Sequence, residues 1–139
     1  QITDCGPVSG HSAQTQAKLQ IMMQYIHDNY SGQITLDDIA GTVLICKSSV
    51  LNIFRIYLHT SPINYVVEYR LKRASKLLVD TENSVCAIAH ETGFENIGYF
   101  CRRFKKLYGV TPINYRKYYR SAERNSMRNI HSDTNVLSG

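Results

Sequence analysis

Hydrophobic and polar positions alternate with a helical period along most of the chain. Apolar side chains recur at steps of three and four from Leu19 to Tyr30, which predicts one helix ending in a turn at 29–32. Similar patterns predict a short helix capped by Thr35, a helix over about 47–58, and a longer one to about 79. Short helices capped by Ser84 and Asn96 and a last helix to about 119 follow. The sequence therefore predicts an all-α fold class with about seven helices.

A repeat organises these helices into two similar halves. The pentapeptides SPINY (61–65) and TPINY (111–115) are separated by 50 residues, and each has a hydroxyl residue followed by proline, typical of a helix start. The same offset pairs Phe54 with Phe104. Ile39 pairs with Ile88 at an offset of 49, because the second copy has one additional residue in its turn. The duplication is therefore structural.

Each copy contains two short helices joined by a tight turn, which is a helix-turn-helix pattern. The long helix between the copies contains no Gly or Pro and is predicted to act as a stiff linker. The predicted parts are a linker (1–12), the first helix-turn-helix subdomain (13–65), the linker helix (66–79), the second helix-turn-helix subdomain (80–120) and a disordered tail (121–139).

Charge is distributed unevenly along the chain. Residues 1–45 carry one lysine against four aspartates, net −3, whereas residues 46–120 carry thirteen Lys/Arg against five Asp/Glu, net +8. A basic segment in a small domain is the footprint expected of a nucleic-acid binder, although a merely solvated basic face has the same composition. No apolar run is long enough to span a membrane, so we expect a cytoplasmic protein without a membrane partner.

Enzymatic chemistry has little support in the sequence. There is no phosphate-binding glycine loop, no H-E-x-x-H motif and no carboxylate pair with a plausible pocket. The cysteines form no C-x-x-C pair and lack zinc-ligand spacing to the histidines, which predicts free thiols in a reducing compartment. We therefore expect no enzyme, no metal and no other cofactor. The cysteines are Cys5, Cys46, Cys86 and Cys101.

The second copy and the helix before it resemble the DNA-binding domain of the AraC/XylS family of bacterial transcription regulators. The matching residues are R-L-x-x-A-x-x-L-L (70–78), I-A-x-x-x-G-F-x-N-x-x-Y-F-x-x-x-F-K-K (88–106), G-V-T-P (109–112) and Y-R (115–116). The resemblance covers roughly 18–119 and implies seven helices in two helix-turn-helix subdomains. Their second helices, about 47–58 and 97–107, would enter successive major grooves of double-stranded DNA, for which one helical turn is roughly 34 Å.

The first copy departs from the family pattern at two positions. Leu44 stands where the family usually has a turn glycine, and Cys46 where it usually has serine or a similar cap. Both changes are predicted to weaken the turn and the start of the helix after it, and Ser48 is the alternative, later cap. The family also commonly contacts RNA polymerase. Because the chain begins at Gln1, we expect it to be a fragment with a sensor domain upstream.

Side chains that the core leaves free are the candidates for reading bases in the first copy. The predicted core residues of helix 47–58 are Val50, Ile53 and Phe54. The positions left outward are Ser48, Ser49, Leu51, Asn52 and Arg55. Of these, Ser48, Leu51 and Asn52 match base-facing family positions. Asn52 suits adenine and Leu51 suits a thymine methyl group. The alternative is an exposed polar face with an ordinary surface leucine.

In the second copy the candidate base-reading residues are Ile97, Gly98, Cys101 and Arg102. A guanidinium can bond both O6 and N7 of guanine, which makes Arg102 the main candidate. A phosphate contact, or a salt bridge to Glu91 or Glu95, is its alternative role.

Phosphate contacts require donors at the edges of the groove and no particular base. Arg70, on the linker helix, has two possible roles: a DNA contact or a link between the two copies through an acidic partner. The candidates for phosphate binding are Lys47, Arg55, Tyr99, Lys105, Lys106 and Arg116.

A helical protein-interaction module is the main alternative function, with the basic face meeting an acidic partner or a polymerase subunit. A gel shift with random duplex DNA at low salt separates the two functions, because only a DNA-binding domain would retard the duplex.

Overall fold

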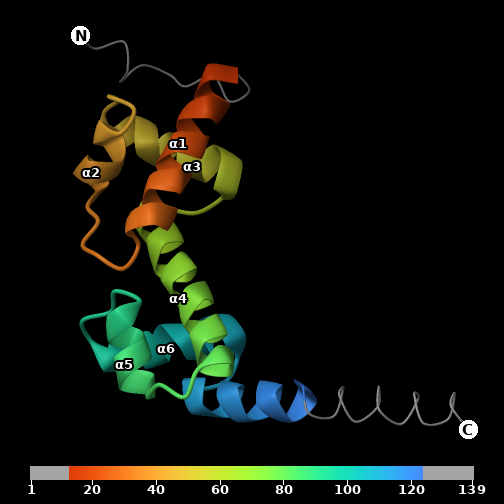
Figure 1. Cartoon of the computed structure of the whole chain (residues 1–139). Coiled ribbons are helices and arrows are strands. Elements are labelled where there is room, and N and C mark those ends of the chain that lie inside the picture. The colour runs from red at the N-terminus through yellow and green to blue at the C-terminus, as the bar shows by residue number, and fades with distance from the viewer. Residues whose placement is uncertain (1–12, 124–139) are drawn as a thin grey trace, which may run out of the picture. The chain divides into compact units, whose positions relative to one another are not determined.

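Every regular element that the structure describes is an α-helix (Figure 1). The structure is a computed structural model in which residues 13–123 are described. The first six helices are α1 (Ala13–Asn29), α2 (Leu36–Gly41), α3 (Lys47–Leu58), α4 (Pro62–Asp80), α5 (Val85–Glu91) and α6 (Ile97–Tyr108). A seventh helix covers residues 112–123. The predicted all-α class with seven helices is confirmed.

The last helix is longer than the sequence predicts. Residues 121–123, assigned to a disordered tail, continue it as helix. The rest of the predicted tail and the whole predicted linker 1–12 lie outside the described residues.

Contacts within the chain define two units, and the division falls inside α4, between Arg70 and Leu71. In the first unit α1 packs against α2 and α3, and in the second unit α5 packs against α6. The first unit extends past residue 65, where the sequence placed its end, because Val66 on α4 belongs to its core. Each unit therefore contains one helix-turn-helix pair.

Side-chain caps start the helices where the sequence predicts them. Thr35 accepts a hydrogen bond from the Asp38 backbone N–H, and the Asp38 carboxylate accepts one from Thr35, which completes a capping box. Ser84 and Asn96 cap α5 and α6 through their side-chain oxygens. Ser61 does the same for α4. These contacts satisfy N–H groups that a helix end otherwise leaves unpaired.

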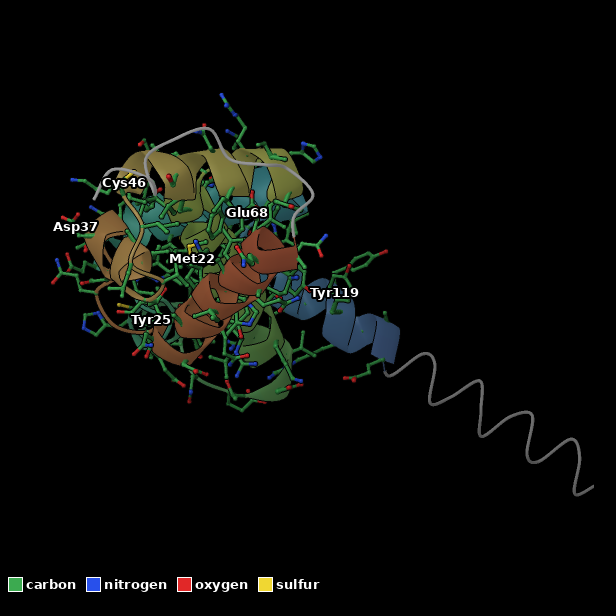
Figure 2. The ribbon with its side chains drawn as sticks, turned by 90° about the horizontal axis from the view of Figure 1, so that it is seen from above. Met22, Tyr25, Asp37, Cys46, Glu68 and Tyr119 are labelled. Atoms are coloured by element: carbon green, nitrogen blue, oxygen red, sulfur yellow. The ribbon has the colours of Figure 1, made fainter. Side chains whose placement is uncertain are left out.

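The core of the first unit is formed by the apolar stripes of α1, α2 and α3, with the start of α4. Met22, labelled in Figure 2, is fully buried in it. Ser49 is also buried, with 3% of its surface exposed, so its expected outward position is wrong. It precedes Ile53 by one helical turn and therefore lies on the core stripe despite its hydroxyl group. The buried core residues are Leu19, Met22, Ile26, Ile39, Ala40, Val50, Ile53, Phe54 and Val66.

An aromatic cluster fills the second unit. Phe100 and Phe104 of α6 are fully buried, and the Phe104 ring contacts Tyr108 and Tyr115. The Tyr108 hydroxyl donates to Ser75 Oγ on α4 at 3.3 Å. Leu107, although apolar and on the same helix, is 44% exposed.

An arginine closes the first unit by reaching back to the loop between α1 and α2. Arg70 on α4 donates from Nε to the Tyr30 carbonyl at 2.7 Å and from Nη2 to the Gly32 carbonyl at 2.6 Å. We call this contact the arginine clasp. It ties the helix that follows α3 to the segment that leads into α2, and it does so entirely inside the first unit.

The second unit has the equivalent clasp. Arg120, 50 residues after Arg70, donates from Nε to the Val79 carbonyl at 3.4 Å and from Nη2 to the Thr81 carbonyl. These acceptors follow Tyr30 and Gly32 by 49 residues, the same offset that relates the two first short helices. Arg120 also forms an ion pair with Glu82 at 2.9 Å. The internal repeat therefore extends past TPINY to residue 120.

Left-handed backbone conformations occur at matching places in both units. Gly93 (φ 100°) in the second turn corresponds to Leu44 (φ 56°) in the first, and Gly109 (φ 82°) after α6 corresponds to His59 (φ 56°) after α3. Glycine adopts this region without steric cost, whereas a residue with a Cβ does not. The first unit therefore keeps the backbone geometry of the second at an energetic cost.

Candidate nucleic-acid interface

The outer face of α3 presents the residues predicted to read bases in the first unit. Ser48 and Leu51 are exposed, Leu51 at 43%, and Asn52 is half-buried beside them. Its carboxamide Oδ1 accepts a hydrogen bond from Arg55 Nη2 at 3.0 Å. One face of the helix thus carries an apolar side chain next to a polar pair.

This face borders a groove of about 510 Å³. The groove begins at α3 and continues across the junction to the start of α4, so it includes residues that the sequence reasoning did not select. They directly follow α3, whose C-cap His59 has a left-handed conformation where the chain changes direction toward α4. The lining residues are Ser48, Leu51, Asn52, Arg55, His59, Thr60 and Ser61.

The start of α3 lacks the side-chain cap found at α5 and α6. Cys46 is the N-cap residue, and its side chain makes no capping hydrogen bond. Its Sγ lies 3.2 Å from Ser48 Oγ and 3.4 Å from Ser49 Oγ. Figure 2 labels Cys46 at this helix start and Asp37 on α2. Asp37 forms an ion pair at 3.5 Å with the exposed Lys47. The helix begins at Lys47, so Ser48 is not its cap.

The outer face of α6 presents the corresponding residues of the second unit. Ile97 (42% exposed) and Arg102 are exposed, and Gly98 and Cys101 are half-buried. A Cβ at Gly98 would lie 3.2 Å from Asn96 Oδ1 and 3.4 Å from Arg102 Nη1. Glycine therefore leaves room for the Arg102 side chain to lie along the first turn of the helix.

Most predicted phosphate-binding residues are exposed cations at the ends of these faces, namely Lys47, Arg55, Lys105 and Lys106. Tyr99 is also exposed, but its hydroxyl accepts a hydrogen bond from Arg103 Nη1 at 3.0 Å.

Arg116 differs from the other predicted phosphate-binding residues. Its Nε donates to the Leu78 carbonyl at 2.7 Å, and its Nη2 donates to the carbonyls of Thr81 and Asn83. These contacts satisfy the Leu78 carbonyl in the last turn of α4 and two carbonyls just after the helix, where a positive charge is favourable. The structure therefore gives Arg116 a role in helix capping that competes with phosphate binding.

Arg70 also has a role that the sequence reasoning missed. It forms the clasp of the first unit, with carbonyl acceptors on Tyr30 and Gly32. Its offset of 50 from Arg120 was the available signal, but backbone acceptors are not visible in a sequence.

Neither a metal centre nor a membrane span is found in residues 13–123. No three His, Cys, Asp or Glu side chains in that range are arranged to hold a metal ion. None of its helices is both long and apolar enough to cross a bilayer.

Comparison with known proteins places these features in a family. A family model described as a helix-turn-helix domain matches residues 32–118. The fold and the match together define a DNA-binding domain of the helix-turn-helix class. The chain belongs to the AraC/XylS family of transcription regulators.

Individual relatives agree with this assignment. The chain is 31% identical over 100 residues to the uncharacterised transcriptional regulator YdeC of Bacillus subtilis, covering 72% of the chain and 34% of YdeC. It is 30% identical to an AraC-type regulator from Chromobacterium violaceum, whose crystal structure it matches with a TM-score of 0.71 over 76% of this chain and 95% of that one. The chain thus spans about a third of the length of YdeC.

The fold also matches a structure solved with nucleic acid. The DNA-binding domain of AdpA, in complex with a target DNA, has a TM-score of 0.69 over 76% of this chain and 94% of that one. Its sequence is 20% identical to the chain, so this similarity concerns the fold.

Proposed function

We propose that the chain is a sequence-specific binder of double-stranded DNA that inserts α3 and α6 into successive major grooves. The observation that carries the proposal is the exposed outer face of each of these helices, which combines cations with side chains able to contact base edges. The solved complex of the AdpA DNA-binding domain with a target DNA supports DNA binding by this fold.

The two helices differ in what they would offer to bases. On α3 the base-reading residues are Ser48, Leu51 and Asn52, with an apolar contact at Leu51. On α6, Arg102 supplies the main donors, and Ile97, Gly98 and Cys101 allow a close approach. We therefore expect two half-sites of different sequence.

The flanking cations would anchor the protein to the phosphate backbone. Lys47, Lys105 and Lys106 supply charge without base preference, and Tyr99 supplies a hydroxyl group. Arg55 is also an exposed cation, and it donates a hydrogen bond to Asn52.

In the full-length protein we infer a regulatory domain outside this chain, since the chain covers 34% of YdeC. We also propose that the protein acts in the cytoplasm and contacts RNA polymerase when it regulates transcription.

Arg102→Ala and Lys105→Ala test the proposal as a matched pair on α6. Loss of Arg102 should weaken binding to a selected site by about 1–3 kcal/mol and relax the preference at one base pair. Loss of Lys105 should weaken binding to all sequences and reduce the salt dependence. The measurement is a fluorescence titration of selected and random duplexes at several salt concentrations. Equal losses on both duplexes for Arg102→Ala would remove its base-reading role.

Failure to bind any duplex, even at low salt, would contradict the proposed function itself. Binding to an acidic protein or a polymerase subunit would then be the remaining use of the basic face.

A further inference from the structure

Asn52 and Arg55 form a coupled pair on the outer face of α3. They are three positions apart, which places them one helical turn apart on the same side. Arg55 Nη2 donates to Asn52 Oδ1 at 3.0 Å, and both residues line the groove described above. Arg55 is exposed, so its guanidinium is accessible to a ligand in that groove.

The chemistry of the two groups fixes how the pair is oriented. A guanidinium has five N–H donors and no acceptor, so the Asn52 carboxamide must turn its oxygen toward Arg55 and its NH2 group away. The arginine uses one of the two lone pairs of that oxygen. The pair therefore presents the two N–H groups of the amide and the four remaining N–H groups of the guanidinium, against a single free acceptor position.

A donor-rich pair discriminates between the two purines. The major-groove edge of guanine offers two acceptors, O6 and N7, whereas adenine offers the acceptor N7 and the donor N6 amino group. The adenine amino group would meet the N–H groups and the positive charge of Arg55. Guanine would accept from both side chains.

We propose that Asn52 and Arg55 act together as one reading element for guanine in the first half-site. This inference rests on the proposed function and changes two earlier expectations, since Asn52 alone suits adenine and Arg55 alone suits phosphate. It makes Arg55 a specificity-determining residue.

The repeat supplies a matched control for this idea. At the offset of 50, Asn52 corresponds to Arg102, and Arg55 corresponds to Lys105. Each helix thus carries one arginine on its outer face, but at positions one turn apart. Lysine at position 105 is a point charge without the planar fork of a guanidinium, so it should act on phosphate alone.

The experiment is selection of bound duplexes from a random pool with the wild-type chain and with Arg55→Ala, Arg55→Lys and Lys105→Ala. The wild type should enrich guanine at one base pair of the first half-site. Arg55→Ala should lower the preference for guanine over adenine there by roughly tenfold, within the range for a good bidentate contact. Arg55→Lys should not restore it, and Lys105→Ala should leave that preference in place while weakening binding to all sequences.

Coupling is tested by adding Asn52→Ala and the Asn52→Ala/Arg55→Ala double variant. If the two side chains read one guanine together, the double variant should lose little more discrimination than either single variant. Circular dichroism of each variant checks that the fold is kept, as expected for residues outside the core.

Three results would overturn the inference. Adenine enriched at that position by the wild type, or a uniform loss on all sequences for Arg55→Ala, would return Arg55 to a phosphate role while leaving the proposed function intact. Absence of enrichment combined with no binding to any duplex would remove the proposed function, and this inference with it.

Discussion

The left-handed turn at Leu44 allows a direct measurement of what the divergent first unit loses in stability. Leu44 has φ of 56° and is 81% exposed, so its side chain contributes little packing. A residue with a Cβ in this region costs roughly 1–2 kcal/mol. Replacement by glycine removes that cost but adds about 0.5–1 kcal/mol of backbone entropy in the unfolded chain. The free energy of unfolding should therefore be higher for Leu44→Gly than for Leu44→Ala by about 1 kcal/mol.

The comparison of Leu44→Gly with Leu44→Ala isolates the backbone term, because both variants lose the leucine side chain. Urea denaturation followed by far-ultraviolet circular dichroism measures the free energy of unfolding. In thermal unfolding, the expected difference corresponds to roughly 4–8 °C for a unit of this size. The reverse change, Gly93→Ala in the second unit (φ 100°), should destabilise by at least a similar amount.

Equal stability of the glycine and alanine variants would refute this reasoning. It would mean that the steric cost at Leu44 is no larger than the chain entropy that glycine adds, or that the turn relaxes out of the left-handed region once the leucine side chain is removed. A destabilised Leu44→Gly with a stable Leu44→Ala would show that chain entropy outweighs the steric cost.

Three further predictions concern stability. Cys46→Ser should supply the missing cap of α3 and raise the free energy of unfolding by about 1 kcal/mol in urea denaturation, whereas Ser84→Ala should lower it by a similar amount. Arg70→Met removes both clasp hydrogen bonds and should cost roughly 2 kcal/mol, seen as faster amide exchange in the first unit; unchanged exchange would contradict it. Burial, followed by the neighbouring Tyr69, raises the pKa of Tyr65 above its ordinary value. The stabilisation by the neutral hydroxyl group is therefore complete below about pH 10 and is lost as the pH rises through the raised pKa. Tyr65→Phe should reduce this alkaline loss of stability, which is measured by denaturation at a series of pH values.

The sequence predicts local features of the fold well. The caps at Thr35, Ser61, Ser84 and Asn96 depend on residues three positions apart, so the pattern and the structure agree. The repeat indicated the division into two similar helix-turn-helix units, since two copies of a pattern are less ambiguous than one.

Contacts between distant residues were not predictable in the same way. Whether Ser49 lies in the core depends on the angle at which α3 packs, and residue type suggested the wrong side. Arg116 appeared to be a surface cation, but its acceptors are carbonyls more than 30 positions earlier in the chain. For the candidate site, the exposed residues could be predicted by subtracting the core, whereas the pairing of Asn52 with Arg55 required the structure.

The acceptors of the arginine clasp are main-chain carbonyls, and every amino acid provides one. Substitutions at Tyr30, Gly32, Val79 or Thr81 can change the side chain without removing the acceptor, provided that the loop keeps its path. Each clasp thus depends on the identity of a single residue, Arg70 or Arg120. The loop before α2 can therefore vary in sequence while Arg70 keeps it attached to α4, whereas the segment before α5 is also held by Arg116, which donates to the carbonyls of Thr81 and Asn83.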